Sequence, residues 1–230
     1  MVSADMSKDT GTVTTMFDEI AAGYDRTRAR MWWGRAEGWS RRTAELAGAG
    51  PGRIVLDVAA GTGTSSAALM ERGATVVASD ISPEMLAVAA QRYPRLTRVV
   101  ADAQVLPFED GLFDATTISM GLRNMADPLA ALRRMRAVTA PGGRLAVCDF
   151  SVPSSRLPRV LWTAYLRHAI PRIGARLGSN PQAYEYFVNT ILGWHSPQAL
   201  GELIREAGWH DVSWHPVDCG IVQIHTAVAR

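Results

Sequence analysis

The sequence predicts an α/β fold built on a parallel, doubly wound sheet, and three observations lead to this prediction. The chain has 230 residues, a length that suits one α/β domain. Hydrophobic residues make up 47% of it, which is enough for a sizeable core. Between residues 53 and 150, short apolar segments alternate with helical patterns of about 10 to 15 residues, as in sheets covered by helices on both faces.

The N-terminal part precedes the first strand of this pattern. We interpret residues 1–14 as a disordered tail, because they are polar and lack the apolar core of a signal peptide. In residues 15–47, Met16, Phe17 and Ile20 recur at helical spacing, which predicts N-terminal helices. We expect everything after the tail, residues 15–230, to form a single domain.

Five apolar segments are predicted to be strands of the parallel sheet. Ser82 and Asp127 each precede a proline and a helical pattern, so both are expected to be N-caps. A turn is expected at 141–143, where two glycines follow a proline. The predicted strands are 53–59, 74–80, 96–102, 112–120 and 144–150, and the helices between them are 64–73, 82–93 and 127–139.

The segment 151–195 interrupts the alternation. It contains four prolines and many aromatic residues, and we predict that it is a helical insert over the ligand-binding edge of the sheet. A helix capped by Ser196 and ended by Gly208 then resumes the pattern. Two closing segments, 210–217 and 220–229, predict a terminal hairpin.

Composition excludes several classes of function. The formal charge of +2 is too small to imply nucleic-acid binding, and no apolar run of about 18 residues predicts a membrane span. The two cysteines, Cys148 and Cys219, are expected to be reduced, as in a cytoplasmic protein. The five histidines are spread along the chain without ligand spacing, so we predict no metal site.

The sequence VLDVAAGTGT at 55–64 ends an apolar strand in two glycines, which predicts a ligand at the carboxyl end of that strand. No lysine follows, as a P-loop requires, and Ser66 replaces the third glycine of a dinucleotide fingerprint. Asp57, four residues before Gly61, would repel a pyrophosphate. S-adenosylmethionine, which carries a sulfonium and an ammonium but no phosphate, suits this carboxylate better, and a dehydrogenase is the disfavoured alternative.

Two more acids follow the next two predicted strands. Asp80 ends the second strand, where such folds place the carboxylate that accepts hydrogen bonds from the ribose hydroxyls. Asp102 follows the third strand and is suitably placed for the adenine amino group, with Ala103 beside it. Three acids at the carboxyl ends of consecutive strands indicate one ligand site rather than three solvated strand ends.

This order and spacing resemble those of the class I S-adenosylmethionine-dependent methyltransferases. The resemblance covers about residues 53–150 and recurs in the terminal helix and hairpin. It implies a Rossmann-like, seven-stranded, mostly parallel sheet whose last strand is antiparallel. It also implies that Gly61 and Gly63 lie near the methionine part of the cofactor, Asp80 on the ribose and Asp102 near the adenine.

Longer motifs outside the cofactor core resemble the menaquinone/ubiquinone-biosynthesis C-methyltransferases. The resemblance implies C-methylation of a quinol-like, phenolic or prenylated aromatic acceptor. It also implies that Arg123 acts in the acceptor site, that Asn124 lies near the cofactor, and that Tyr24 contacts cofactor or acceptor. The motifs include MFDEIAAGYD at 16–25, TISMGLRNMADPLAALRRM at 117–135, SNPQAYEYF at 179–187 and GIVQIH at 220–225.

The identity of the general base stays open. A ring carbon is a weak nucleophile until the neighbouring phenol loses its proton, and a general base typically adds about 10²–10⁴-fold. Arginine has a pKa above about 12, so we expect Arg123 to steady a phenolate or orient a water rather than act as the base. His195 is an alternative base, and its other interpretation is a polar cap before the following helix.

The sequence departs from the family motifs at Thr64 in the cofactor half and, in the predicted acceptor half, at Arg28, Asn189, Thr190 and His195. These departures leave two alternatives open. One is a diverged actinobacterial secondary-metabolite methyltransferase with a different C-, N- or O-acceptor. The other is a non-methylating, cofactor-binding relative.

We expect the partner to be a small, lipophilic acceptor and not nucleic acid, and we expect the protein to be cytoplasmic. Peripheral contact with the inner face of the membrane and a homodimer stay open. The tryptophans of the N-terminal helices are expected to pack between those helices or to form an apolar mouth for a prenyl tail.

The predicted site residues fall into three groups. The catalytic candidates are Tyr24, Arg123 and His195; the cofactor candidates are Asp57, Ala59, Gly61, Thr62, Gly63, Asp80, Ile81, Met85, Asp102, Ala103, Ser119 and Asn124; the acceptor candidates are Arg28, Trp32, Trp33, Tyr165, Tyr184, Asn189 and Thr190.

Overall fold

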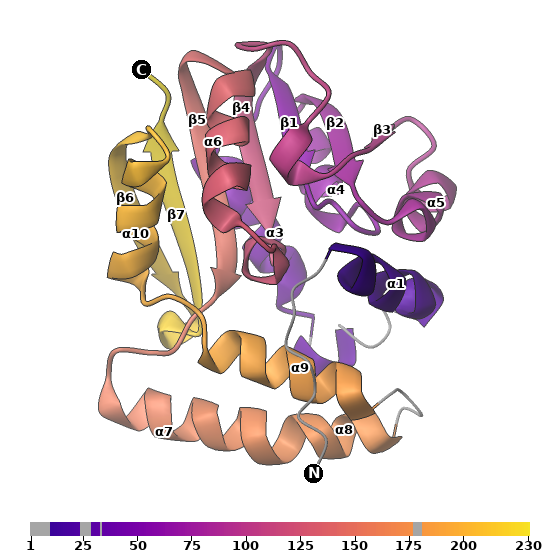
Figure 1. Ribbon diagram of the computed structural model, residues 1–230, viewed down its shortest axis with the longest axis vertical. Coiled ribbons are helices and arrows are strands. Elements are labelled where there is room, and N and C mark those ends of the chain that lie inside the picture. The colour runs from indigo at the N-terminus through magenta and orange to yellow at the C-terminus, as the bar shows by residue number, and fades with distance from the viewer. Residues whose placement is uncertain (1–9, 24–28, 33, 177–180) are drawn as a thin grey trace.

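The centre of the protein is a seven-stranded sheet (Figure 1). The computed structural model describes residues 10–23, 29–32, 34–176 and 181–230. The strand order is β3-β2-β1-β4-β5-β7-β6. The strands are β1 (Ile54–Val58), β2 (Thr75–Asp80), β3 (Thr97–Val100), β4 (Phe113–Ser119), β5 (Thr139–Phe150), β6 (His210–Val217) and β7 (Val222–Val228).

The pairing pattern confirms the predicted doubly wound fold. Strands β1 to β5 pair in parallel, and the chain crosses from β3 to β4 past β2 and β1, so that the sheet grows outwards in both directions from its centre. Strand β7 lies antiparallel between β5 and β6, which confirms the terminal hairpin. The carboxyl ends of the parallel strands therefore meet at one edge of the sheet, where ligands bind in this class of fold.

Helices cover both faces of the sheet. Helices α3 and α4 pack with α5 against one face, and α6 and α10 cover the other (Figure 1). Three of these helices begin at the predicted caps: the side chains of Ser82, Asp127 and Ser196 each accept a hydrogen bond from the backbone N–H three residues later. The five helices are α3 (Ala36–Leu46), α4 (Thr64–Glu71), α5 (Pro83–Arg92), α6 (Pro128–Val138) and α10 (Pro197–Glu206).

The predicted insert is helical and lies beyond the carboxyl edge of the parallel strands (Figure 1). Its aromatic and aliphatic side chains share one apolar cluster with the ends of β5 and β7 and with the start of α3. No helix in the described residues combines the length and apolarity needed to cross a bilayer. The insert consists of α7 (Arg156–Ala164), a π-helical turn η4 (Tyr165–Ala169), α8 (Ile170–Arg176) and α9 (Pro181–Leu192).

Two boundaries differ from the sequence prediction. Helix α1 (Thr10–Ile20) begins inside the segment predicted to be a tail. Its first half is rich in threonine and shows no apolar pattern, but the helix packs on α5. The segment 141–143 is not a turn before the strand but lies within β5. Phe113 pairs with Thr139 and Ala115 with Arg144, so the extra residues of β5 form an irregularity in the ladder.

Short 3-10 turns complete the described chain and bring several site residues to the sheet edge. Turn η1 (Ala21–Gly23) follows α1, and η5 (Asp218–Gly220) joins β6 to β7. Turn η2 (Ala103–Val105) follows β3, and η3 (Leu122–Asn124) follows β4. The last two turns stand at the carboxyl edge, beside the ends of β1 and β2.

Candidate functional site

The turn after β1 uses its two glycines for different physical reasons. Both have positive φ, +55° at Gly61 and +84° at Gly63, a conformation that favours glycine. A Cβ at Gly63 would lie 2.9 Å from the Tyr93 ring and 3.3 Å from the Ala89 side chain, so this glycine permits close packing against α5. A Cβ at Gly61 would meet no atom within 4 Å, because this glycine faces a cavity.

That cavity has a volume of about 170 Å³ and lies at the carboxyl edge of the sheet. A second, smaller cavity of about 70 Å³ adjoins it beside η2. The two share lining residues from α1, from the ends of β1 and β2 and from η3, so they adjoin, and together they are called the recess. The residues common to both are Val13, Ala59, Asp80, Ile81, Asn124 and Met125.

The predicted cofactor residues gather around this recess. The larger cavity is lined by Ala59, Gly61, Thr62, Asp80, Ile81, Met85, Ser119 and Asn124, and the smaller one adds Asp102 and Ala103. The other two predicted cofactor residues, Asp57 and Gly63, line neither cavity.

Asp80 stands where the two cavities meet. Its Oδ2 accepts a hydrogen bond from the Gly61 N–H at 2.7 Å, and its Oδ1 accepts one from the Ser82 N–H at 2.9 Å. Burial raises the pKa of this carboxyl, and the backbone donors oppose that rise. Because each carboxylate oxygen can accept more than one hydrogen bond, Asp80 keeps capacity for hydroxyl groups of a ligand.

Asp57 supports the turn rather than lining the recess. Its carboxylate is fully buried and accepts hydrogen bonds from the hydroxyls of Ser65, Ser66 and Thr117 at 2.7 to 2.8 Å. Burial raises its pKa, against the effect of the three hydroxyls. Ser65 itself lines the larger cavity, so Asp57 helps to fix one lining side chain and the start of α4 in position.

Arg123 reaches the other side of the larger cavity from η3. Its Nη1 donates to Asp149 Oδ1 at 2.6 Å and to the Met120 carbonyl at 2.7 Å, and the side chains of Arg123 and Asp149 are 5% and 2% exposed. The guanidinium carbon lies 5.2 Å from the centre of the Phe150 ring and 5.4 Å from that of Phe187, within reach of cation–π attraction. Among the described residues, Arg123 Nε has no hydrogen-bond partner.

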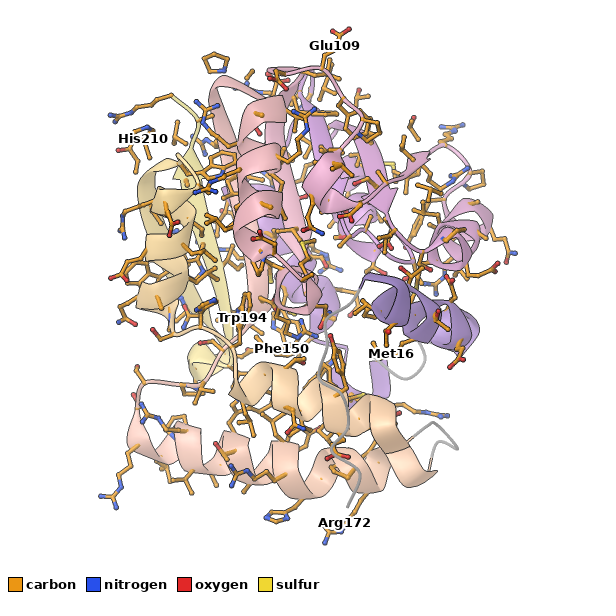
Figure 2. All side chains as sticks on the ribbon, viewed as in Figure 1. Met16, Glu109, Phe150, Arg172, Trp194 and His210 are labelled. Atoms are coloured by element: carbon orange, nitrogen blue, oxygen red, sulfur yellow. The ribbon has the colours of Figure 1, made fainter. Side chains whose placement is uncertain are left out.

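Aromatic side chains close the cavity beyond Arg123. Phe150 ends β5 and lies between the sheet and α9 (Figure 2). Its ring centre is 4.8 Å from that of Trp32 and 5.6 Å from that of Phe187. Trp32 is thus the one predicted acceptor residue that lines the cavity within the described part of the chain, and Trp39 lies beside it.

The other predicted acceptor residues lie elsewhere or outside the described chain. Tyr165 lines a separate outer groove, and Tyr184 is buried in the apolar cluster of the insert. Asn189 is exposed, and the Thr190 hydroxyl donates to the Phe187 carbonyl at 2.9 Å. Tyr24, Arg28 and Trp33 lie outside the described residues.

The structure separates His195 from the recess. Its side chain is exposed, its ring lies 4.8 Å from that of Trp194, and it borders a small void behind Asp149 instead of the larger cavity.

Cys148 does line the larger cavity, but burial raises the pKa of its thiol to about 12, so it stays protonated at neutral pH. In the described residues, no group of three histidine, cysteine or acidic side chains is arranged to hold a metal ion.

Several lining residues were missed by the sequence prediction. Val13 and Phe17 form the roof from α1, and the Ser82 hydroxyl fixes this helix by donating to Asp18. The segment containing Val13 is polar, so its pattern resembled a tail. Phe150 and Phe187 are ordinary apolar residues in a strand and a helix, and no local sequence signal distinguishes them from core residues.

Comparison with known proteins accounts for this arrangement. The profile of the ubiE/COQ5 methyltransferase family matches residues 4–229. Demethylmenaquinone methyltransferase of Mycolicibacterium paratuberculosis is 45% identical over 99% of this chain and 98% of its own, and that of Mycobacterium tuberculosis (strain H37Rv) is 44% identical over 98% and 95%. A SAM-dependent methyltransferase of Thermotoga maritima has the same fold, with a TM-score of 0.69 and 15% identity over 95% of this chain and 100% of its own. The chain belongs to the ubiE/COQ5 methyltransferase family.

Proposed function

We propose that this protein transfers the methyl group of S-adenosylmethionine to a ring carbon of a quinol-like acceptor of the demethylmenaquinol type. The observation that carries the proposal is the position of Arg123. Its buried guanidinium faces the same cavity as the glycine turn and Asp80, so a cationic donor and a cofactor site share one space. The relatives named above, which are demethylmenaquinone methyltransferases, support this choice of acceptor.

The residues around the recess fit S-adenosylmethionine. Asp80 offers acceptor capacity for two ribose hydroxyls, and Asp102 borders the smaller cavity where an amino group of adenine would donate. The buried Ser119 hydroxyl lines the larger cavity and has no hydrogen-bond partner among the described residues. Gly61 keeps the wall open where any side chain would intrude. None of these features requires a phosphate.

When bound, the cofactor supplies an electrophilic methyl group on a sulfonium. The protein must therefore hold an acceptor ring in line with it and favour the electron-rich form of that ring. The new bond joins the methyl carbon to a ring carbon while the carbon–sulfur bond breaks, and the ring hydrogen then leaves as a proton. An acceptor hydroxyl that has lost its proton makes the ring carbon nucleophilic.

Arg123 is suited to stabilise that oxygen. A guanidinium group has hydrogen-bond donors and no acceptor, so Arg123 is suited to donate to a phenolate rather than to act as the general base. Arg123 lines the cavity, and its buried Nε lacks a partner within the described chain. Removing a preorganised donor to a developing oxyanion typically costs about 10²–10³-fold in kcat.

The aromatic wall is suited to a flat acceptor. Trp32, Phe150 and Phe187 place apolar surface next to the guanidinium, which excludes water and strengthens its electrostatic effect. We propose that these three rings, rather than Tyr184, Asn189 and Thr190, contact the acceptor ring. The departures at 189, 190 and 195 then lie outside the cavity lining, and the one at Thr64 lies in it on the cofactor side, which supports an acceptor of the family type over a diverged one.

Two finer features belong to this proposal. The acceptor is proposed to be lipophilic, and the protein is proposed to be cytoplasmic with peripheral contact at the inner face of the membrane.

The direct test is turnover. The protein is incubated with methyl-labelled S-adenosylmethionine and a chemically reduced demethylmenaquinone, and the product is analysed by mass spectrometry for a methyl group on ring carbon. Arg123→Lys is expected to lower kcat by about 10²-fold with cofactor affinity within twofold. Arg133→Lys, on a surface pair with Glu206, is the matched control and should retain full activity. Transfer to oxygen or nitrogen, or cofactor binding without any transfer, would refute the proposal.

A further inference from the structure

The outer surface of α7 carries a ridge of exposed apolar side chains. Leu157, Val160 and Leu161 are 69%, 57% and 62% exposed. Their spacing of three and four residues places them on one face of the helix. On the opposite face, Trp162 and Leu166 are buried in the core of the insert. Helix α7 is therefore apolar on its inner side, as packing requires, and apolar also on a side that packs against nothing described.

The segment that carries this ridge is rich in positive charge. Residues 150–184 contain five arginines and no aspartate or glutamate. With +2 for the whole chain and +5 for this stretch, the rest of the protein carries −3. Four of these arginines, Arg156, Arg159, Arg167 and Arg172, are exposed, and none forms a salt bridge with a carboxylate of the described residues. Arg172 points away from the sheet (Figure 2).

An apolar groove of about 820 Å³ begins at this ridge. Leu157 and Leu161 belong to its lining, together with the more deeply placed Trp162 and Tyr165. At its other end are Trp32 and Trp39, which also line the cavity that contains Arg123. The ridge thus stands at the outer end of an apolar path whose inner end is the wall of the reaction cavity.

We propose that this face of α7 and α8, defined by Leu157, Val160, Leu161 and the four exposed arginines, docks on an anionic lipid bilayer. Exposed leucine and valine side chains insert at the boundary between headgroups and acyl chains, and arginines bind the lipid phosphates. A second copy of this chain is a poor occupant, because apposing two such faces would bring together two sets of arginines that have no carboxylate partner among the described residues. The asymmetry between this face and the acidic remainder orients the protein on a negative surface.

Docking in this orientation turns the mouth of the groove towards the membrane. A lipophilic acceptor could then pass from the bilayer along Trp162 and Tyr165 to the wall formed by Trp32 and Trp39. This consequence rests on the function proposed above, whereas the docking itself does not.

The test is co-sedimentation of the full chain with vesicles, without any enzymatic readout. Vesicles of phosphatidylcholine containing phosphatidylglycerol are compared with vesicles of phosphatidylcholine alone. We expect binding to the anionic vesicles, weakening as salt is raised. Replacing Arg156 and Arg167 together by Gln should weaken binding about 25-fold, since each charge near an anionic surface contributes about fivefold. The triple change Leu157→Ser, Val160→Ser and Leu161→Ser should weaken it at least about tenfold.

Matched controls separate docking from general surface effects. Val105→Ser removes an apolar side chain that is 71% exposed in η2, and Arg95→Gln with Arg133→Gln removes two exposed charges outside the ridge. Both controls should bind like the unaltered protein, and every variant should unfold at an unchanged temperature.

Three results would overturn the proposal. They are equal binding to both kinds of vesicle, equal loss in the ridge variants and in the controls, or a wild-type dimer that the triple variant converts to a monomer. Because no turnover is measured, failure of docking leaves the methyl-transfer proposal standing, and failure of methyl transfer leaves docking standing.

Discussion

The ion pair between Arg123 and Asp149 gives the sharpest prediction about this site. Changing Asp149 to Asn removes the negative charge but keeps the size of the side chain. The guanidinium then remains 5% exposed without its counter-ion, and its bond to Oδ1 becomes an ordinary hydrogen bond. Changing Arg123 to Gln produces the reverse defect, since a carboxylate with 2% exposure loses the cation beside it.

The expected cost follows from the burial of both partners. Removing one member of a buried pair typically costs about 3–5 kcal/mol. Here the backbone N–H of Phe150 still donates to Asp149 Oδ1, and the Met120 carbonyl still accepts from Arg123, so we take the lower value, about 3 kcal/mol for each single change. The double variant buries no charge, and we expect it to lose only about 3–4 kcal/mol instead of about 6. The coupling energy is then about 2–3 kcal/mol.

Urea denaturation of the four proteins measures this cycle. Each single variant should shift the midpoint by about 3 kcal/mol divided by m, with m itself unchanged. The Asp149→Asn enzyme should also lose kcat with little change in cofactor affinity, because Arg123 remains present but is less firmly held. Additivity of the two single changes within about 0.5 kcal/mol would refute the coupling and with it the positioning role of Asp149.

Three further predictions concern the cofactor edge and the far strand. Asp80→Asn should weaken calorimetric binding of S-adenosylhomocysteine by about 1–3 kcal/mol, whereas Asp110→Asn on the surface should not change it. Gly63→Ala should destabilise folding by more than about 1 kcal/mol through backbone strain and contact with Tyr93, whereas Gly61→Ala should lower affinity more than stability, because its methyl group enters the cavity. Burial lowers the pKa of His225, so between that lowered value and about 6.5 the unfolded chain binds a proton that the native chain does not. The free energy of unfolding should therefore fall as pH drops through this window. In urea denaturation at a series of pH values, His225→Gln should remove this fall, whereas His210→Gln should leave it in place.

The cofactor edge was predictable from sequence because its signals are local. Asp57 is the penultimate residue of β1 and Asp80 is the last residue of β2, and the ends of adjacent parallel strands must be neighbours. The caps at Ser82 and Ser196 were equally visible, since a cap and its helix are adjacent in the chain. Such features need no knowledge of how distant segments pack.

The acceptor side was less predictable because its contacts join distant segments. Arg123 was identified from a motif, but its partner Asp149 is 26 residues away, inside the buried strand pattern of β5. On α9, the motif drew attention to Asn189, yet at about 100° per residue this position points away from the face occupied by Phe187 and Ile191. Which face of a helix borders a cavity is decided by the helix's docking, and sequence periodicity alone shows only that a buried face exists.

The energetics of the Arg123–Asp149 pair also bear on its role. A buried ion pair is often no more stabilising than apolar side chains of similar volume, because desolvation offsets the attraction between the charges. Stability alone is therefore a weak reason for this fold to keep a guanidinium beside Phe150 and Phe187, where apolar packing would serve as well. What the pair does provide is a positive group in the cavity wall that is anchored at Nη1 and whose Nε has no partner among the described residues. We infer that these charges are buried because the pair holds that positive group at a fixed position. The cycle above should therefore separate stability from turnover. The neutral double variant should recover part of the free energy of unfolding that the single variants lose, but none of the lost kcat.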